Sequence, residues 1–254
     1  MSSFAIKITA CVCMLCDHIG YCMQYYRVGD FGSAEILRII GRLAFPLFAF
    51  FIAEGYRRTH NAVLYILRML IMAFLTEIPF DLCFGKSVSF YNHTNVLFTF
   101  SFALIALCFV DMAVHTKRKE LRILALFPIL AACYLSYRFS TDYSYYGVLL
   151  IFAFYFVPTK GLKSKLTLVP ILLLFGLRFA IRDAITNAHI SDWAVTQVFS
   201  SLSLIPIFLY NGKKGYSPKN KFAKKAVQYA FYLFYPVHMI ALYYIFTRFF
   251  LNVI

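Results

Sequence analysis

Two ionisable residues stand next to each other inside the first apolar run of the chain. Asp17 and His18 follow the start of the run 4–26 by about 14 residues, which places them roughly 20 Å along a helix at about 1.5 Å per residue. An ionisable group inside a bilayer costs about 2.5–3.5 kcal/mol on insertion scales, so each one calls for a functional hypothesis. A histidine with an ordinary proton affinity can deprotonate an amine or a hydroxyl near neutral pH. The pair therefore predicts acid–base chemistry at depth.

Arg42 is expected at a similar depth, because the second run, 36–56, crosses in the opposite direction. Adjacent helical residues point about 100° apart, so Asp17 and His18 do not form a simple dyad. We expect Asp17 to pair with an arginine of the second run while His18 faces a cavity. A purely structural alternative is a buried Asp–Arg pair beside a histidine that is hydrogen-bonded to a backbone carbonyl. Snorkelling to the interface would explain Arg38 without any function.

Other polar residues are expected towards the same side of the membrane. Glu77, Asn95 and Asp142 fall at or near the outer ends of their runs, and we expect them to line a substrate pocket with Arg42. His238 lies about midway along the last run, two residues after a proline that removes a backbone donor and opens the helix locally. It would add a second titratable imidazole near the midplane.

The inner end of the second run carries Glu54, Arg57 and Arg58. A guanidinium group can bind phosphate through two parallel hydrogen bonds, so arginines at a cytoplasmic helix end suit an anionic cofactor. Membrane topology alone explains the two arginines about as well. Together with the outer cluster, these residues predict transfer of a group from a cytosolic donor to an external acceptor.

The composition indicates a membrane protein. Of the 254 residues, 61% are hydrophobic and 14% are charged, whereas soluble domains have about half and roughly a quarter. The apolar residues form repeated runs of about 20, each long enough to cross a hydrocarbon core of roughly 30 Å. We predict an all-α, polytopic transmembrane helical bundle that forms a single domain over residues 1–254. The nine expected spans are 4–26, 36–56, 62–84, 95–115, 120–138, 143–158, 164–182, 190–210 and 224–250.

The basic residues, which give a net charge of +14, lie in short loops after alternate spans. The positive-inside rule then places the N-terminus and these loops in the cytoplasm, and it explains the charge without any nucleic acid partner. The loops are 57–58, 117–119, 160–165 and 213–225.

The seven cysteines lie almost entirely within the expected helices. Their odd number argues against a disulfide framework, and their spacing is not that of a zinc site. We interpret them as small apolar residues in helix packing, and we expect no metal.

A series of motifs runs along nearly the whole chain. The most specific combination is Asp17-His18-Ile19-Gly20 followed by Gly41-Arg42-Leu43-Ala44-Phe45-Pro46. The series resembles the TraX family of bacterial membrane acetyltransferases, named for the protein that N-acetylates a conjugative pilin. The other motifs are Glu54-Gly55-Tyr56-Arg57-Arg58-Thr59, Glu77-Ile78-Pro79-Phe80-Asp81, Asn95-Val96-Leu97-Phe98-Thr99, Tyr145-Tyr146-Gly147, Asn211-Gly212-Lys213-Lys214-Gly215 and Phe234-Tyr235-Pro236-Val237-His238.

The resemblance implies a multi-pass acetyltransferase of the bacterial inner membrane that takes acetyl-CoA as donor. The acceptor would be an amine or hydroxyl at the outer side, on a pilin-like protein N-terminus or a glycan. A histidine in an early helix acts as the base in related acyltransferases, which points to His18, with Asp17 orienting it and His238 assisting. Arg42 would position the acyl group, and the pantetheine arm would thread inward from Arg57 and its neighbours.

Two other functions stay open. A proton-coupled transporter would use Asp17, His18 and Glu77 as a relay, although we detect no inverted repeat of the kind common in transporters. A non-enzymatic assembly factor of a pilus or secretion complex would use its polar residues only to lock helices together. Binding of acetyl-CoA separates the enzyme from both alternatives.

Overall fold

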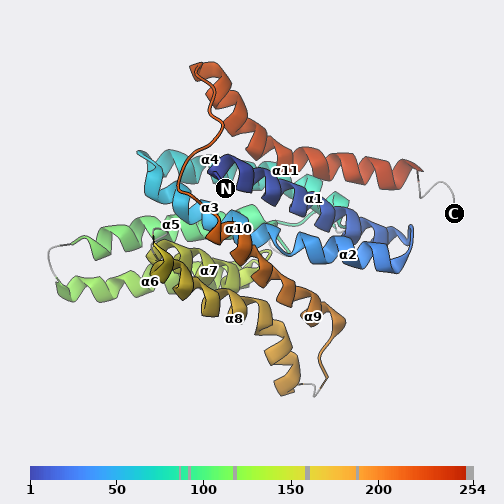
Figure 1. Ribbon diagram of the computed structural model, residues 1–254, viewed down its shortest axis with the longest axis horizontal. Coiled ribbons are helices and arrows are strands. Elements are labelled where there is room, and N and C mark those ends of the chain that lie inside the picture. Colours follow the sequence, from blue (N-terminus) through green and yellow to red (C-terminus); the bar gives the residue numbers. More distant parts are fainter. Residues whose placement is uncertain (86, 91–92, 117–118, 158–160, 187–188, 250–254) are drawn as a thin grey trace. The chain divides into compact units, whose positions relative to one another are not determined.

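The described part of the chain is helical and has no strands (Figure 1). The computed structural model describes residues 1–85, 87–90, 93–116, 119–157, 161–186 and 189–249. The α-helices are α1 (Ser3–Tyr26), α2 (Phe31–Gly41), α3 (Ala44–Arg58), α4 (Ala62–Cys83), α5 (Val96–Val114), α6 (Leu126–Arg138), α7 (Ser144–Phe156), α8 (Leu162–Thr186), α9 (Asp192–Val198), α10 (Leu204–Phe208) and α11 (Lys221–Phe249). Two 3-10 helices, η1 (Lys119–Ala125) and η2 (Phe199–Ser203), precede α6 and α10.

Within the described residues, six helical stretches are long and apolar enough to cross a membrane. They are Ser3–Tyr26, Phe31–Arg58, Ala62–Cys83, Val96–Val114, Leu162–Thr186 and Lys221–Phe249. Each corresponds to one of the nine predicted spans. The prediction of an all-α, polytopic membrane protein is confirmed.

The other three predicted spans are shorter or are built from pieces. η1 with α6, and α9 with η2 and α10, follow one another without a loop. A 3-10 residue rises about 2.0 Å and an α residue about 1.5 Å, so these composites extend roughly 33 Å and 28 Å. Both values are close to the thickness of a hydrocarbon core. α7 has 13 residues and reaches only about 20 Å. Some predicted positions lie outside the described residues. They are the basic residues Lys117, Arg118 and Lys160 and the predicted span ends at 158 and 250.

The chain forms two compact units. Unit 1 comprises Met1–Phe48, Leu82–Lys86 and Val157–Ile254, and unit 2 comprises Ala49–Asp81 and Ser87–Phe156. Unit 1 thus contains α1, α2 and α8 to α11, whereas unit 2 contains α5 to α7. α3 and α4 contribute residues to both units.

Hydrogen bonds in unit 1 join the segments that the charge pattern places in the cytoplasm. The amide of Ser3 donates to the carbonyl of Lys213 at 2.8 Å, so the start of α1 lies beside the basic loop before α11. The ammonium of Lys165, at the start of α8, donates to the carbonyls of Phe208 and Tyr210 at 2.7 and 3.0 Å. The N-terminus and two basic segments therefore lie at one end of the unit, as a common cytoplasmic side requires.

Candidate active site

Asp17 lies between two arginines, Arg38 in α2 and Arg42 at the C-terminal cap of the same helix. Its carboxylate accepts a hydrogen bond from Arg42 and forms a second ion pair with Arg38 at 2.9 Å. Arg38 also donates to the carbonyl of Asp17 at 3.3 Å, and Arg42 donates to the carbonyl of Arg38 at 3.3 Å. Sequence reasoning predicted that Asp17 pairs with an arginine of the second run, and both Arg38 and Arg42 do so. It did not predict that two arginines would share the carboxylate.

Glycines let α1 and α2 approach closely enough for these ion pairs. A Cβ on Gly41 would collide with the Cα and Cβ atoms of Asp17. A Cβ on Gly20 would lie 2.7 Å from the carbonyl oxygen of Ala34, closer than real Cβ contacts. Because neither glycine has a Cβ atom, the Asp17 carboxylate can lie directly against the end of α2.

The second membrane stretch, Phe31–Arg58, is broken directly after Gly41. α2 ends at Gly41 and α3 begins at Ala44, with Arg42 and Leu43 in a turn. Pro46 has no N–H and cannot donate to the carbonyl four residues earlier, that of Arg42, so the helical hydrogen-bond ladder is interrupted there. Arg42 is therefore a helix cap rather than an interior residue, and it is only 5% exposed.

His18, the next residue of α1, pairs with His238 of α11. The distance between His18 Nδ1 and His238 Nε2 is 2.7 Å, and the two residues are 8% and 6% exposed. Their ring planes differ by 4° and their centroids are 5.0 Å apart. Because two atoms of these parallel rings are only 2.7 Å apart, the rings lie largely edge to edge, which aligns the N–H of one with the lone pair of the other.

The remaining contact of His238 fixes the tautomers of both rings. His238 Nδ1 lies 2.6 Å from the carbonyl oxygen of Phe234, which can only accept, so Nδ1 carries a proton. In two neutral imidazoles, His238 Nε2 is then an acceptor and His18 Nδ1 is its donor. His18 Nε2 is left with a lone pair, and it makes no hydrogen bond to the described residues. A nitrogen with a lone pair of this kind can accept a hydrogen bond or a proton.

Aromatic residues enclose the imidazole pair. Phe84 meets the ring of His18 edge-on, with centroids 5.4 Å apart and planes at 85°. Phe234 packs against His238 at 4.8 Å, and Tyr235 lies within about 6 Å of both rings. α11 bends along its course and contains Pro236 two residues before the histidine (Figure 1). A proline commonly causes such a bend.

Glu77 and Asn95 lie in unit 2 and form a structural tie between α4 and α5. Both residues are fully buried. Glu77 accepts from the backbone amide of Asn95 at 3.0 Å and from its side-chain amide. The side-chain amide also donates to the carbonyl of Ala73 at 2.8 Å, and its oxygen caps α5 by accepting from the amide of Leu97 at 2.9 Å. All polar groups of the Asn95 side chain are therefore engaged.

Asp142, the second acidic residue expected in the pocket, lies in the exposed turn between α6 and α7. Its carboxylate accepts from the amide of Tyr143 at 3.1 Å, while its own amide donates to the carbonyl of Thr94 at 2.9 Å. Tyr143 and Ser144 both have positive φ values, of 62° and 45°. These contacts assign Asp142 to the shape of a tight turn.

The arginines expected to hold an anionic cofactor form a compact cluster at the end of α3. Glu54 accepts from Arg57 at 3.1 Å and also from Arg58. Arg57 further donates to the last carbonyls of α7, those of Phe154 and Tyr155. Arg57 therefore caps α7, while the side chain of Arg58 is 37% exposed.

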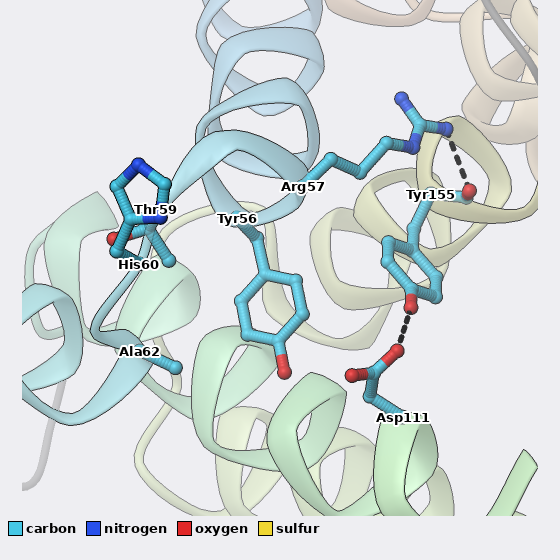
Figure 2. Close-up of a pocket in the computed structure, with 7 residues that line it drawn as sticks. All are labelled: Tyr56, Arg57, Thr59, His60, Ala62, Asp111 and Tyr155. Carbon is cyan, nitrogen blue, oxygen red and sulfur yellow. Dashed lines mark hydrogen bonds between the residues drawn. The ribbon is translucent and has the colours of Figure 1, made fainter. Parts of the chain in front are cut away.

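A cavity of about 350 Å³ opens beside this cluster in unit 2 (Figure 2). Arg57 and Tyr155 stand on one side and Thr59 and His60 on the other, with Tyr56 between them. The phenol of Tyr155 donates to the carboxylate of Asp111, which closes the wall beside Arg57. Sequence reasoning named Arg57 and quoted Tyr56 and Thr59 in the same motif. It missed the other lining residues, which come from one loop and three helices: His60, Ala62 in α4, Asp111 in α5 and Tyr155 in α7.

Comparison with known proteins identifies the family. The model of the TraX protein family matches residues 2–246. The chain belongs to the TraX family. Among known proteins, this TraX-family chain is 31% identical over 249 residues to the probable fimbrial assembly protein FimC, serogroup H1, of Dichelobacter nodosus, and the alignment covers 94% of this chain and 93% of that protein. No solved structure matches it.

Proposed function

We propose that this chain is a transmembrane acyltransferase that moves an acetyl group from cytosolic acetyl-CoA to an amine or a hydroxyl at the outer side of a bacterial inner membrane. The observation that carries the proposal is the chain of hydrogen bonds from His18 through His238 to the carbonyl of Phe234. This chain of hydrogen bonds leaves a lone pair on His18 Nε2, well inside a membrane-spanning helix. Placing an ionisable group there costs free energy, which argues that the group has a function. A neutral base next to reacting groups is what acyl transfer requires.

The proposed transfer step has a definite proton balance. The acceptor nitrogen or oxygen forms a bond to the acetyl carbonyl carbon, and its proton passes to His18 Nε2. The carbon–sulfur bond of the thioester breaks, and the departing thiolate takes a proton from the imidazolium. During the step, the positive charge on His18 is stabilised by His238 Nε2, which accepts from the Nδ1–H group. His238 thus takes the orienting role that a carboxylate has in a serine protease triad.

Asp17 supports this chemistry by fixing α1 against α2. Its ion pairs with Arg38 and Arg42 hold the helix in one rotational setting, and the adjacent residue His18 then points towards α11. The ion pairs also place two guanidinium groups near His18 for the negative charge that develops on the acetyl oxygen. Asp17 is thereby a positioning residue and not a proton acceptor.

The loop after α3 supplies donors for the anionic part of acetyl-CoA. Arg57 is engaged in capping α7, so the proposal assigns phosphate binding to Arg58 with Thr59 and His60 at the cavity. A volume of about 350 Å³ is at the lower end of ligand pockets, which span roughly 300–1,000 Å³, so the cavity suits a portion of this large donor.

The name of the relative also favours a second candidate function, that of an assembly factor. A fimbrial assembly protein contributes to the formation of a surface fibre, and such a contribution requires no acetyl transfer. Within the acyltransferase proposal, the same name favours the amine of a pilin-like subunit as acceptor over a glycan hydroxyl. A proton-coupled transporter has no such support among the relatives.

The decisive experiment measures thiol release from acetyl-CoA by the purified chain in lipid bilayers. It is run with a peptide that has a free N-terminal amine and, separately, with a short glycan. We expect acceptor-dependent release from the natural chain and its loss in His18→Ala. His115→Ala provides the matched control, because His115 is an exposed histidine in unit 2, and it should keep full activity. Thiol release that persists in His18→Ala would remove His18 from the mechanism.

The alternatives have their own signatures in the same preparation. A natural chain that neither binds nor cleaves acetyl-CoA, but restores fibre formation to cells that lack it, would establish the assembly factor. Substrate flux driven by a pH gradient without acetyl-CoA would establish the transporter. Either result would end the acyltransferase proposal.

A further inference from the structure

Two of the seven cysteines lie side by side although 61 residues separate them in the sequence. The Sγ atoms of Cys22 in α1 and Cys83 at the end of α4 are 3.7 Å apart, and both residues are fully buried in unit 1. A disulfide has an S–S distance of about 2.05 Å. Joining the two thiols therefore requires an approach of less than about 2 Å. Interpreting every cysteine as a packing residue overlooked this pair.

The segment that contains Cys83 is docked along one face of α1. Phe84 meets Tyr21 edge-on with centroids 4.4 Å apart and planes at 75°. Gly85 has a φ of +63°, and the phenol of Tyr25 occupies the space that a Cβ would need. Residues three and four apart share a helix face, so Cys22 lies within a continuous row of contacts from His18 to Tyr25.

This row lies at the outer end of both helices. Cys22 is roughly 29 Å from the start of α1, at about 1.5 Å per residue, and only one turn from the C-terminal end at Tyr26. Cys83 is the last residue of α4. With the N-terminus inside, both ends face the external compartment, where disulfides form and persist in bacteria.

We propose that Cys22 and Cys83 form a disulfide that secures the outer end of α1 to the end of α4. The oxidant is a disulfide-bearing protein or small molecule of the external compartment. One cysteine, as thiolate, attacks the oxidant's disulfide and expels one thiolate from it. The second cysteine then displaces the other, so that two protons and two electrons leave the pair and the oxidant becomes a dithiol. Opening of the turn after α4, at a helix end, provides access.

The bond also concerns the candidate active site. Phe84 follows Cys83 directly and packs against the ring of His18, one turn before Cys22. A covalent link at Cys83 therefore holds one wall of the imidazole pair in place. The inference depends on the outward placement of this end and is independent of acyl transfer.

The test uses the full chain in cells with an oxidising external compartment. Cells are quenched with N-ethylmaleimide, and thiols are then counted with a heavy maleimide in denaturant before and after reduction. Of the seven thiols, we expect two to label only after reduction, and an unreduced digest to contain a linked peptide pair with Cys22 and Cys83. In Cys83→Ala, no thiol should be protected. Cys133→Ala is the matched control and should keep two protected thiols.

Two results would overturn the proposal. One is complete alkylation of all seven thiols before reduction, and the other is a protected pair that persists in Cys83→Ala. The bond should also form in His18→Ala. Loss of transfer in that variant with the bond intact separates the fate of the disulfide from that of the proposed function.

Discussion

The chain buries two polar clusters that look alike in sequence and differ in what they leave available. In unit 1, His18 and His238 share one hydrogen bond, and His18 Nε2 makes none with the described residues. In unit 2, the amide and carbonyl of Asn95 are all engaged, with Glu77, Ala73 and Leu97 as partners. A buried polar side chain is thus a candidate functional residue. Whether its polar atoms are all engaged in hydrogen bonds within the protein then indicates its role. On this comparison we expect chemistry at the first cluster and a structural role for Asn95 in the second.

The comparison predicts its largest effect at His18. His18→Gln fills similar space but has no basic nitrogen, so acetyl transfer should fall by about 10²–10⁴-fold, the usual contribution of a general base. The thermal stability of the detergent-solubilised protein should change little. Initial rates with saturating acetyl-CoA, together with a melting curve, test both parts. A stability loss as large as that of Asn95→Ala would make His18 a structural residue instead.

The converse is expected at Asn95. Asn95→Ala removes the cap of α5, worth about 0.5–2 kcal/mol, and the side-chain amide that donates to the buried Glu77, worth about 1–3 kcal/mol. The free energy of unfolding should therefore fall by roughly 2–4 kcal/mol, while the protein that stays folded should transfer acetyl groups normally. Unfolding in denaturant and activity per folded molecule measure the two effects. Normal stability with lost transfer would place Asn95 in a substrate pocket after all.

A smaller effect separates orientation from catalysis at His238. His238→Gln can still accept from His18 Nδ1 through its amide oxygen but does not have the fixed geometry of the ring, so transfer should fall by at most about tenfold, less than a whole hydrogen bond is worth. His238→Ala should lose more, and its profile of rate against pH should change because the tautomer of His18 is no longer fixed. Identical losses in the two variants, with an unchanged pH profile, would contradict the orienting role.

The smallest effect tests the contact beneath the cluster. Gly41→Ala introduces a methyl group against Asp17, and such overpacking typically costs about 1–3 kcal/mol. Part of this cost is relieved if α2 moves away from α1, which loosens the ion pairs and lowers transfer a few-fold. Gly161→Ala is a control glycine change in open space, with strain only from its φ of +88°. Equal effects of the two changes would show that the close approach of Gly41 to Asp17 does not matter for transfer.

The charge near Arg58 offers a separate test of the donor side. Arg58→Gln should raise the KM for acetyl-CoA about tenfold with kcat nearly unchanged, because a charge-assisted hydrogen bond contributes about 1.5–3 kcal/mol to binding. Arg57→Gln should instead destabilise the end of α7. If Arg58→Gln leaves KM unchanged, the phosphates bind elsewhere.

Sequence reasoning succeeded where one helix or two consecutive helices decide the outcome. Hydropathy predicted the long spans, and opposite helix directions predicted that Arg42 would lie at the depth of Asp17. It failed for contacts between distant helices, such as His18 with His238, because hydropathy carries no information on which helices are neighbours. A depth argument was available, since the two histidines follow the starts of parallel helices α1 and α11 by about 15 and 17 residues.

The hydropathy pattern also did not predict the exact helix boundaries. The span expected at 190–210 consists of α9, η2 and α10, because hydropathy does not distinguish a 3-10 from an α ladder. The role of Asn95 required knowledge of which helix it begins and what lies across from it. Its position at the start of a span, before Val96 and Leu97, was the signal for a cap.

The distances along the chain between these partners set an order for biosynthesis. Asp17 and Arg42 are 25 residues apart, so the ribosome delivers both before the third membrane stretch exists. His18 and His238 are 220 residues apart, and the second imidazole emerges only with α11. The carboxylate of Asp17 can therefore be neutralised while most of the described helices have yet to be made. The imidazole pair, in contrast, forms only after α11 has been added.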